Sequence, residues 1–269
     1  MSQAVSLDHA GIVGPELGAL ARAFERLGFT LTPLARHAGG RTGNRCIMLH
    51  GSYIELLATM PGGASATLDR MLARHAGIHI LAFGIDDEIA AQSRLRCAGI
   101  AAPAPVTTER PVDDRHPDGP RARFVLVSPP DGPEGRVHLI RHETPDVLWQ
   151  PAFMAHANNA LALTEILVAS DAPAATAARL SRLAGRPVVP DPSGGFALDL
   201  PRGRIRMVPD GSTGPVPRFA GLTIATADGN RAIAARLASN AMPHRNEAGG
   251  IVVEAGGTTV RFTATPPAA

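Results

Sequence analysis

One structural unit is repeated four times along this chain of 269 residues. In each copy a short β-prone run leads through a turn into an amphipathic helix, and further strand-like runs follow. The copies begin with residues 7–31, 78–100, 161–185 and 219–242, and the fourth is the weakest. A repeated unit that cannot bury its own apolar face must pack on its neighbours. The repeat therefore predicts an α+β protein of four βαβββ modules, arranged as two paired, cupped mixed sheets that curl around a pocket.

The first copy shows the local signals most clearly. Apolar residues recur at helical spacing from Leu17 to Leu27, Pro15 suits a first helical turn, and Gly28 ends the helix. Three strand-like runs follow, at residues 29–37, 44–50 and 53–59. The copies group into an N-terminal domain of residues 1–145, a connector of residues 146–160 and a C-terminal domain of residues 161–266. In the second copy we expect residues 107–121 to form a long polar loop.

Composition excludes several classes of function. Hydrophobic residues make up 45% of the chain and charged residues 19%, as in ordinary globular proteins. All 26 basic residues are arginine, which indicates a GC-rich, bacterial coding genome rather than a particular chemistry. A net charge of +2 and an aromatic content of 4% provide neither a basic stripe nor stacking platforms for nucleic acid.

No feature of the sequence predicts a membrane or secretory protein. The two cysteines, Cys46 and Cys97, form no disulfide framework or CxxC pair and read as small core residues. The first residues lack a signal-peptide pattern, and no apolar run approaches about 18 residues. We expect a reduced, cytoplasmic protein that binds a small molecule; whether it forms a homodimer is left open.

Several segments together resemble a known superfamily. They are LDHAGI at residues 7–12, YIELLA at 53–58, GRVHLIRHETPDVLW at 135–149 and MAHANNALALTEILV at 154–168. In these segments the chain resembles the vicinal oxygen chelate superfamily, and within it the glyoxalase-like domain proteins. The resemblance is good over about the first 170 residues and continues beyond them only as module shape. It implies the fold of glyoxalases, bleomycin-resistance proteins and dihydroxybiphenyl dioxygenases.

The resemblance also implies where a divalent metal would lie. In the superfamily the ligands come from the first and last strands of each module, which points to His9, Glu55 and His138 in this chain. The fourth position falls near Leu81, which cannot bind a metal, and His79 is the candidate substitute. Imidazole and carboxylate ligands suit Fe(II), Zn, Ni, Co or Mn. For His9 the alternative is a hydrogen-bonded histidine at a strand end.

Two functions remain open on this basis. The first is a metal-dependent enzyme, of a lyase or isomerase type or of a ring-cleaving dioxygenase type, acting on a substrate that chelates through adjacent oxygens. The second, the alternative to this leading interpretation, is a metal-free protein that binds or sequesters a small molecule, and the incomplete ligand set supports it. Nothing in the sequence supports a third class, an interaction module.

Further side chains are candidates for contacts with the substrate. Glu55 and His142 are the predicted catalytic groups, since a buried carboxylate needs a role and a histidine titrates near neutrality. Tyr53 and Asn44 are predicted to bind substrate, or else to be a core tyrosine and a turn residue. Arg115, in the polar loop, is either an anion clamp or part of a solvated turn.

The C-terminal half carries a different set of polar residues. Glu165 stands where the first module has His9, and Arg206 and Arg261 replace the closing acids. A second metal site is therefore not expected. We expect this half to be a scaffold or a second cup for an anion, with Glu165 paired to one of the arginines.

Overall fold

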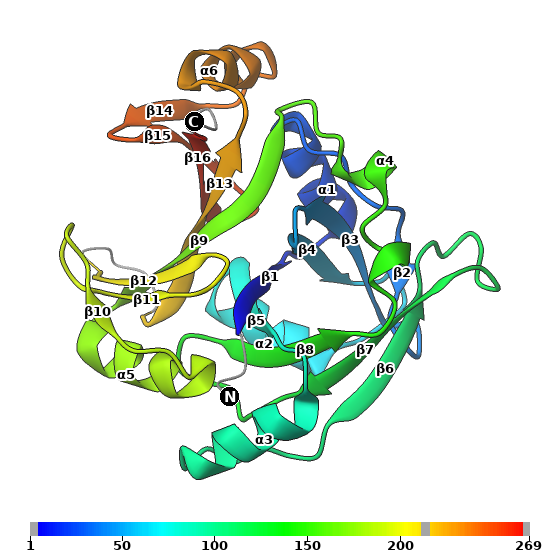
Figure 1. Ribbon diagram of the computed structural model, residues 1–269. Coiled ribbons are helices and arrows are strands. Elements are labelled where there is room, and N and C mark those ends of the chain that lie inside the picture. Colours follow the sequence, from blue (N-terminus) through cyan, green and yellow to red (C-terminus); the bar gives the residue numbers. More distant parts are fainter. Residues whose placement is uncertain (1–4, 211–215, 266–269) are drawn as a thin grey trace.

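The chain forms two eight-stranded mixed sheets that lie side by side (Figure 1). This computed structural model describes residues 5–210 and 216–265. The first sheet contains strands β1–β8 and the second contains β9–β16, which confirms the predicted α+β fold of four βαβββ modules. The expected domain end at Pro266 lies outside the described residues.

The N-terminal sheet is built from the first two modules. The first module contains β1 (Ser6–Val13), α1 (Leu17–Arg26), β2 (Ala35–Arg36), β3 (Thr42–Leu49) and β4 (Ser52–Thr59). After α2 (Ala66–Arg74), the second contains β5 (Gly77–Gly84), α3 (Glu88–Cys97), β6 (Val106–Pro111), β7 (Arg121–Val127) and β8 (Arg136–His142). The strand order is β2-β3-β4-β1-β5-β8-β7-β6, so the opening strands of the two modules pair antiparallel at the centre.

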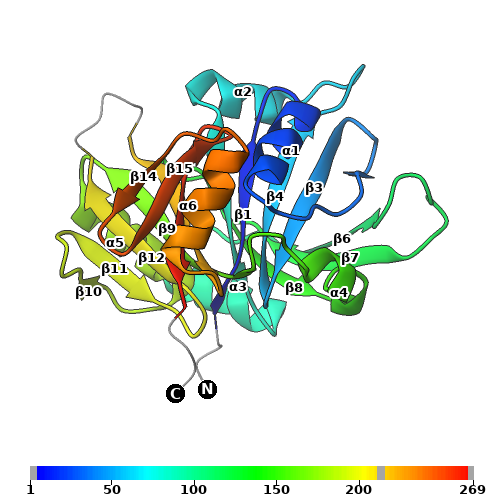
Figure 2. The same cartoon turned by 90° about the horizontal axis from the view of Figure 1, so that it is seen from above.

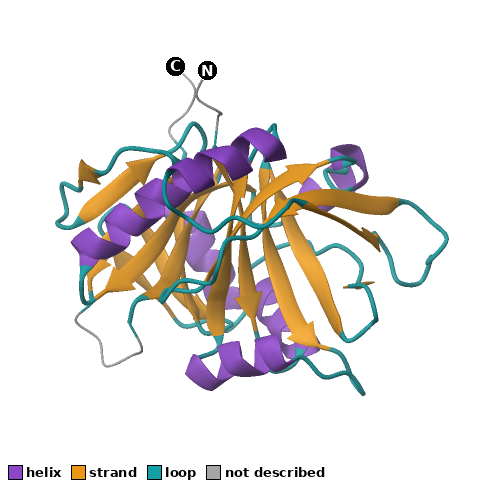
Figure 3. Cartoon of the chain, turned by 90° about the horizontal axis from the view of Figure 1, so that it is seen from below, coloured by secondary structure: helices purple, strands orange, loops and turns teal. Residues whose placement is uncertain are grey.

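The C-terminal sheet repeats this plan. A 3-10 helix (Pro145–Val147) and α4 (Pro151–Met154) connect the two sheets. The third module contains β9 (Ala160–Ser170), α5 (Pro173–Ala184), β10 (Val189–Pro190), β11 (Phe196–Asp199) and β12 (Arg204–Pro209). The fourth contains β13 (Arg218–Thr226), α6 (Asn230–Ser239), β14 (His244–Glu247), β15 (Gly250–Ala255) and β16 (Thr258–Ala264). Figures 2 and 3 show helices on both sides of the strands.

Three local predictions differ from the structure. The expected strand at residues 29–37 is reduced to β2, and Pro33, which has no backbone donor, lies just before it. The expected loop at residues 107–121 is a β-hairpin, because β6 and β7 pair from Val106 with Leu126 to Pro111 with Arg121. Helix α2 was not expected; Ser65 caps its first turn by accepting from the Leu68 N–H.

One shared hydrophobic core joins the two sheets. A single hydrophobic cluster takes in Leu81 and Phe83 of β5 together with Ile166 of β9 and Leu222 of β13. Strand side chains alternate between faces, so the neighbours of Leu81 on β5 point the other way. One of those neighbours, Ile80, lines a cavity together with side chains of β1, β4 and β8.

Candidate functional site

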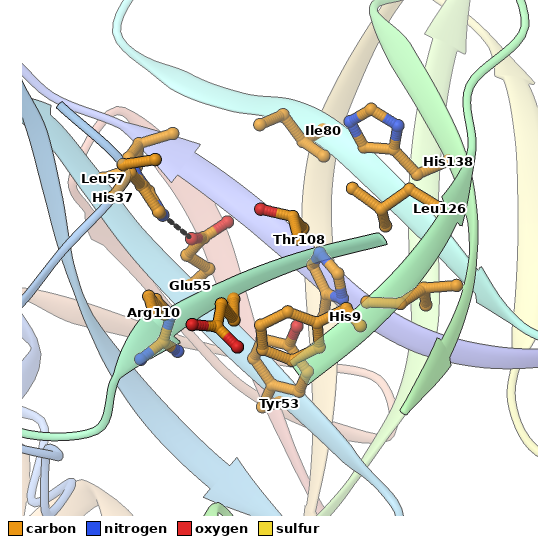
Figure 4. Close-up of a pocket in the computed structure, with 14 residues that line it drawn as sticks. His9, His37, Tyr53, Glu55, Leu57, Ile80, Thr108, Arg110, Leu126 and His138 are labelled. Atoms are coloured by element: carbon orange, nitrogen blue, oxygen red, sulfur yellow. Dashed lines mark ion pairs between the residues drawn. The ribbon is translucent and has the colours of Figure 1, made fainter. Parts of the chain in front are cut away.

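A cavity of about 320 Å³ lies on the concave face of the N-terminal sheet. A pocket of this size suits a small organic molecule. Its walls come from β1, β4, β5, β6, β7 and β8 and from the segment before β3 (Figure 4). The lining residues are His9, His37, Ala38, Tyr53, Glu55, Leu57, Ile80, Thr108, Glu109, Arg110, Phe124, Leu126, His138 and Ile140.

A β-bulge in β1 places two polar side chains side by side. The pairing of β1 with β5 shifts between Leu7 and His9, so Asp8 is an extra residue in the strand. Asp8 and His9 are both buried, and the His9 Nδ1–H donates to Asp8 Oδ1 at 2.7 Å. This hydrogen bond fixes the imidazole tautomer and leaves Nε2 of His9 as the free atom of a cavity-lining ring.

His142 lies outside the cavity and contacts it only through other residues. Its Nε2–H donates to Asp8 Oδ2 at 3.0 Å, and its ring meets the edges of Tyr53, Phe124 and Trp149. With Asp8 it lines a second cleft, beside Arg202 of the C-terminal half. The prediction that His142 is a polar group in the cavity is therefore corrected. His142 is the last residue of β8, and the residues of β8 that line the cavity are His138 and Ile140.

Asp8 is an ionised carboxylate held between two histidines. Burial by itself would raise the pKa of Asp8, but the hydrogen bonds and the positive field of His142 and His9 outweigh it and lower the pKa to about 2. Asp8 was missed by the sequence reasoning, although it stands directly before His9. Only the bulge brings it to the same side of the strand, and a strand pattern with alternating faces does not predict a bulge.

Glu55 lies at the centre of a second polar group. Its Oε1 accepts from the Asn44 amide at 2.5 Å, and the His37 Nε2 is 3.5 Å away. Burial opposes ionisation, but the contacts with His37, His9 and Asn44 outweigh it and keep the pKa of Glu55 well below its ordinary value. Asn44 is buried and reaches the site through Glu55. Tyr53 does line the cavity, where its ring stacks on His9 with centroids 4.3 Å apart.

His138 faces the cavity from β8. Its Nδ1 is hydrogen-bonded to the Ser128 hydroxyl at 2.8 Å, and Nε2 is the ring nitrogen that does not take part in this bond. Burial, followed by the positive charges of Arg136 and His9, lowers the pKa of His138 to about 4. A neutral imidazole with one nitrogen held in place is the form that binds a metal ion.

His138 is expected to remain neutral down to about pH 4 in the metal-free protein. An unfolded chain would protonate this histidine near pH 6.5. The unfolded state therefore binds more protons between these values, and the free energy of unfolding falls as the pH drops from about 6.5 to 4. Imidazole ¹⁵N NMR, with the signal assigned by a His138→Gln variant, measures the midpoint. A midpoint above pH 6 would contradict the structure.

The position in the second module that corresponds to His9 is Ile80, not Leu81. His9 pairs with Tyr53, two residues before Glu55, and Ile80 pairs with Arg136, two residues before His138. His79 lies on the opposite face of β5 and is not a substitute ligand. Its Nε2 bonds the His75 carbonyl at 2.8 Å, and the two histidine rings lie 4.1 Å apart.

The three proposed donors share a cavity without converging on one point. Strands β4, β1, β5 and β8 are consecutive in the sheet, so Glu55 and His138 are three strand spacings apart, roughly 14 Å in a flat sheet. Within residues 5–210 and 216–265, no three His, Cys, Asp or Glu side chains are close enough to hold a metal ion. The donors fit a divalent metal in kind, and Glu55 and His138 would have to turn towards His9 to share one.

Gly11 keeps the floor of the cavity open. It lies two residues after His9, beside Glu55 in β4 and Ile80 in β5. A Cβ atom at this position would lie 2.8 Å from the Cβ of Ile80, which is too close for any side chain. The missing side chain therefore preserves space between the two halves of the site.

The cation that reaches the cavity is Arg110, not Arg115. Arg115 is at the exposed tip of the β6–β7 hairpin and pairs with Asp113 at 2.7 Å. Arg110 is only 7% exposed and lines the cavity with Thr108. The alternation of Thr108 and Arg110 within residues 107–121 was the available signal, but the polar composition of that segment predicts a loop.

In the C-terminal sheet an ion pair takes the place of the proposed metal ligands. Glu165 pairs with Arg204 in the strand register as His9 does with Tyr53, which confirms its predicted position. Its carboxylate binds the Arg206 guanidinium at 3.1 Å, with Arg206 at the position of Glu55. In the fourth module the corresponding position is Gly221, which pairs with Thr259, two residues before Arg261.

Comparisons with known proteins agree on family and fold. A family model described as a glyoxalase-like domain matches residues 7–184. Comparison with curated proteins finds no match. None of the helices in the described part of the chain is long and apolar enough to cross a membrane.

Three solved structures are similar over nearly the whole chain. A hypothetical protein from Staphylococcus aureus has a TM-score of 0.73 at 16% identity, covering 97% of this chain and 100% of that one. A mutant 4-hydroxymandelate synthase from Streptomyces coelicolor has a TM-score of 0.64 at 15% identity, covering 98% and 93%. The Mn(II)-bound glyoxalase from Novosphingobium aromaticivorans has a TM-score of 0.61 at 13% identity, covering 98% and 83%. At these identities the likeness concerns the fold.

Proposed function

Since the chain belongs to the glyoxalase-like domain family of the vicinal oxygen chelate superfamily, we propose that it is a metal-dependent enzyme acting on a small molecule with adjacent oxygen atoms. The reaction would take place in the N-terminal cavity. The observation that carries the proposal is that His9, Glu55 and His138 line this one cavity. Each stands on the opening or closing strand of its module.

The chemistry of the three side chains supports the metal assignment. His9 and His138 each have Nδ1 hydrogen-bonded, to Asp8 and to Ser128, so Nε2 is the atom available for a ligand. Glu55 is ionised and has a second carboxylate oxygen. A bound divalent cation would acidify a substrate hydroxyl and stabilise an enediolate. The Mn(II)-bound glyoxalase with the same fold makes Mn(II) the first ion to test.

The remaining cavity residues suit substrate binding and proton transfer. His9 is the group best placed to accept a proton when it is not a ligand, because Asp8 holds its Nδ1–H and leaves Nε2 to the cavity. Glu55 is a poor base, since its contacts with His37 and Asn44 favour the ionised state. Burial raises the pKa of Tyr53, so its hydroxyl stays protonated and can donate to a substrate oxygen. Ile80, Leu126 and Phe124 provide apolar walls.

The reaction type depends on the metal. Two histidines and one carboxylate form the ligand set of non-haem Fe(II) oxygenases, whereas Mn, Ni, Co or Zn would favour proton transfer in a lyase or isomerase. The fold neighbours include both a glyoxalase and a 4-hydroxymandelate synthase. Uptake of oxygen by the Fe(II)-loaded protein with candidate substrates would distinguish the two types.

A metal-free binding or sequestration protein is the second candidate. It is favoured by Ile80 at the fourth ligand position and by the separation of the three donors. In this case the cavity would hold a ligand through Tyr53, Arg110 and its apolar walls, without turnover.

Metal analysis distinguishes the two candidates. The protein is purified without chelators, soaked in turn with Fe(II), Mn(II), Ni(II), Co(II) and Zn(II), desalted, and analysed for metal content. About one ion per chain, lost in His9→Ala, is expected for the enzyme. Wild-type protein that retains no ion after any of these treatments would rule the enzyme out and favour the binding protein.

A further inference from the structure

Arg110 is a buried cation in the wall of the cavity. It belongs to β6, where Thr108 and Arg110 point to the same side, and only 7% of it is exposed. Figure 4 shows both residues on the strand that crosses the cavity, near Glu55 and Tyr53. Its guanidinium contacts are the Pro111 carbonyl at 3.3 Å, the Cys46 sulfur at 3.7 Å and the face of the Phe124 ring at 5.8 Å.

None of these contacts neutralises its charge. Burial raises the pKa of the Cys46 thiol to about 12, so the sulfur is neutral at pH 7. The neighbouring Glu109 binds Arg121 instead, at 2.6 Å, and Glu55 binds Asn44. Among the described residues, no carboxylate oxygen lies within 4.0 Å of a guanidinium nitrogen of Arg110, so Arg110 forms no ion pair there. A guanidinium has five N–H donors, and a buried charge without a partner is costly.

We propose that Arg110 binds the carboxylate of a small organic acid, which makes it the residue that selects the charge of the ligand. The planar guanidinium matches a carboxylate in two parallel hydrogen bonds. The hydroxyls of Thr108 and Tyr53 line the same cavity and can add donors. Leu57, Ile80 and Leu126 line the same cavity and fit an apolar or aromatic body. This proposal rests on the cavity being a ligand site, as proposed above, but requires no metal.

A ligand-binding arginine and a structural arginine respond differently to removal. If Arg110 were held by Phe124 and Cys46, replacing it would lower the stability of the ligand-free protein. If Arg110 is unpaired until a ligand binds, Arg110→Met keeps most of the packing and removes the unpaired charge. The variant is then expected to melt higher than the wild type in ligand-free buffer, by about 2–4 °C.

The test compares an acid with its neutral counterpart. Binding of mandelate, mandelamide and phenyl phosphate is measured by calorimetry in EDTA, for the wild type, Arg110→Met and Arg115→Met. Arg115 is the matched control, an exposed arginine at the tip of the same hairpin. We expect wild type and Arg115→Met to prefer mandelate over mandelamide by about tenfold or more. Arg110→Met is expected to lose that preference.

Each other outcome overturns the proposal. Equal binding of mandelate and mandelamide by the wild type, or no binding of either, would show that the cavity does not select a carboxylate. If the wild type binds phenyl phosphate more tightly than mandelate, the group that Arg110 binds is a phosphate and not a carboxylate. Retained preference in Arg110→Met, or a lower melting temperature of its ligand-free form, would assign Arg110 a structural role. Since EDTA is present throughout, these results do not depend on whether the protein binds a metal.

Discussion

Glu55→Gln is expected to lower the affinity of the protein for Mn(II) by more than about 100-fold. Loss of an outer-sphere partner alone typically costs 10- to 100-fold in metal affinity, and Glu55 is the only anion in the proposed ligand set. Glutamine keeps the size and the hydrogen bond with Asn44 but removes the charge. Electron paramagnetic resonance of free Mn(II) during a titration measures the dissociation constant directly.

Glu109→Gln is the matched control for Glu55→Gln. Glu109 lines the same cavity, but it is bound to Arg121 and lies outside the proposed ligand set. We expect its replacement to leave the Mn(II) affinity within about threefold of the wild type. An exposed ion pair contributes little energy, so its loss should disturb the cavity little. If both variants bind Mn(II) as the wild type does, Glu55 is not a ligand. If both lose it equally, the effect is one of overall charge.

Asp8→Asn is expected to cost about 2 kcal/mol of stability at pH 7. The pKa of Asp8 is lowered to about 2 from 3.8, and each pKa unit corresponds to about 1.4 kcal/mol. An asparagine offers the two histidine N–H groups one acceptor oxygen in place of two and carries no charge. This is a lowered acid pKa, so its contribution is complete above pH 3.8 and is lost as the pH falls through 2.

Urea unfolding at pH 7 and at pH 3 measures this dependence. The difference between wild type and Asp8→Asn should shrink to about 1 kcal/mol at pH 3, because Asp8 is then largely protonated in the unfolded wild type. Asp86→Asn, at an exposed aspartate beside the same cleft, should change stability little at either pH. A difference between wild type and Asp8→Asn that does not vary with pH would show that the charge of Asp8 is not involved.

The predicted architecture is confirmed because its signals are local. Helix α1 covers Leu17–Arg26, where the apolar spacing placed it, and the four-module order follows from the repeat. The errors occur where a contact across the sheet overrides a local signal. Residues 106–111 have the composition of a loop, yet pairing with β7 makes them strand β6. Composition reports the preference of a segment, and the partner strand decides its conformation.

The site was predicted in part for the same reason. His9, Glu55 and His138 were predicted from the resemblance to the superfamily, in which the ligands come from the first and last strands of each module. Their exact separation follows from sheet curvature, which depends on packing between all strands. Ile80 was missed by one residue, since the pairing register of β5 with β8 fixes that position.

The four modules, the family and the strand faces that carry the candidate ligands could all be predicted from the amino-acid sequence. These follow from periodicity and from short segments, in which the information lies within a few residues. Two features required the three-dimensional structure: Asp8 joins His9 to His142, and Arg110 lines the cavity while Arg115 does not. The bulge in β1 and the β6–β7 hairpin produce these contacts, and each depends on the register between strands that are distant in sequence.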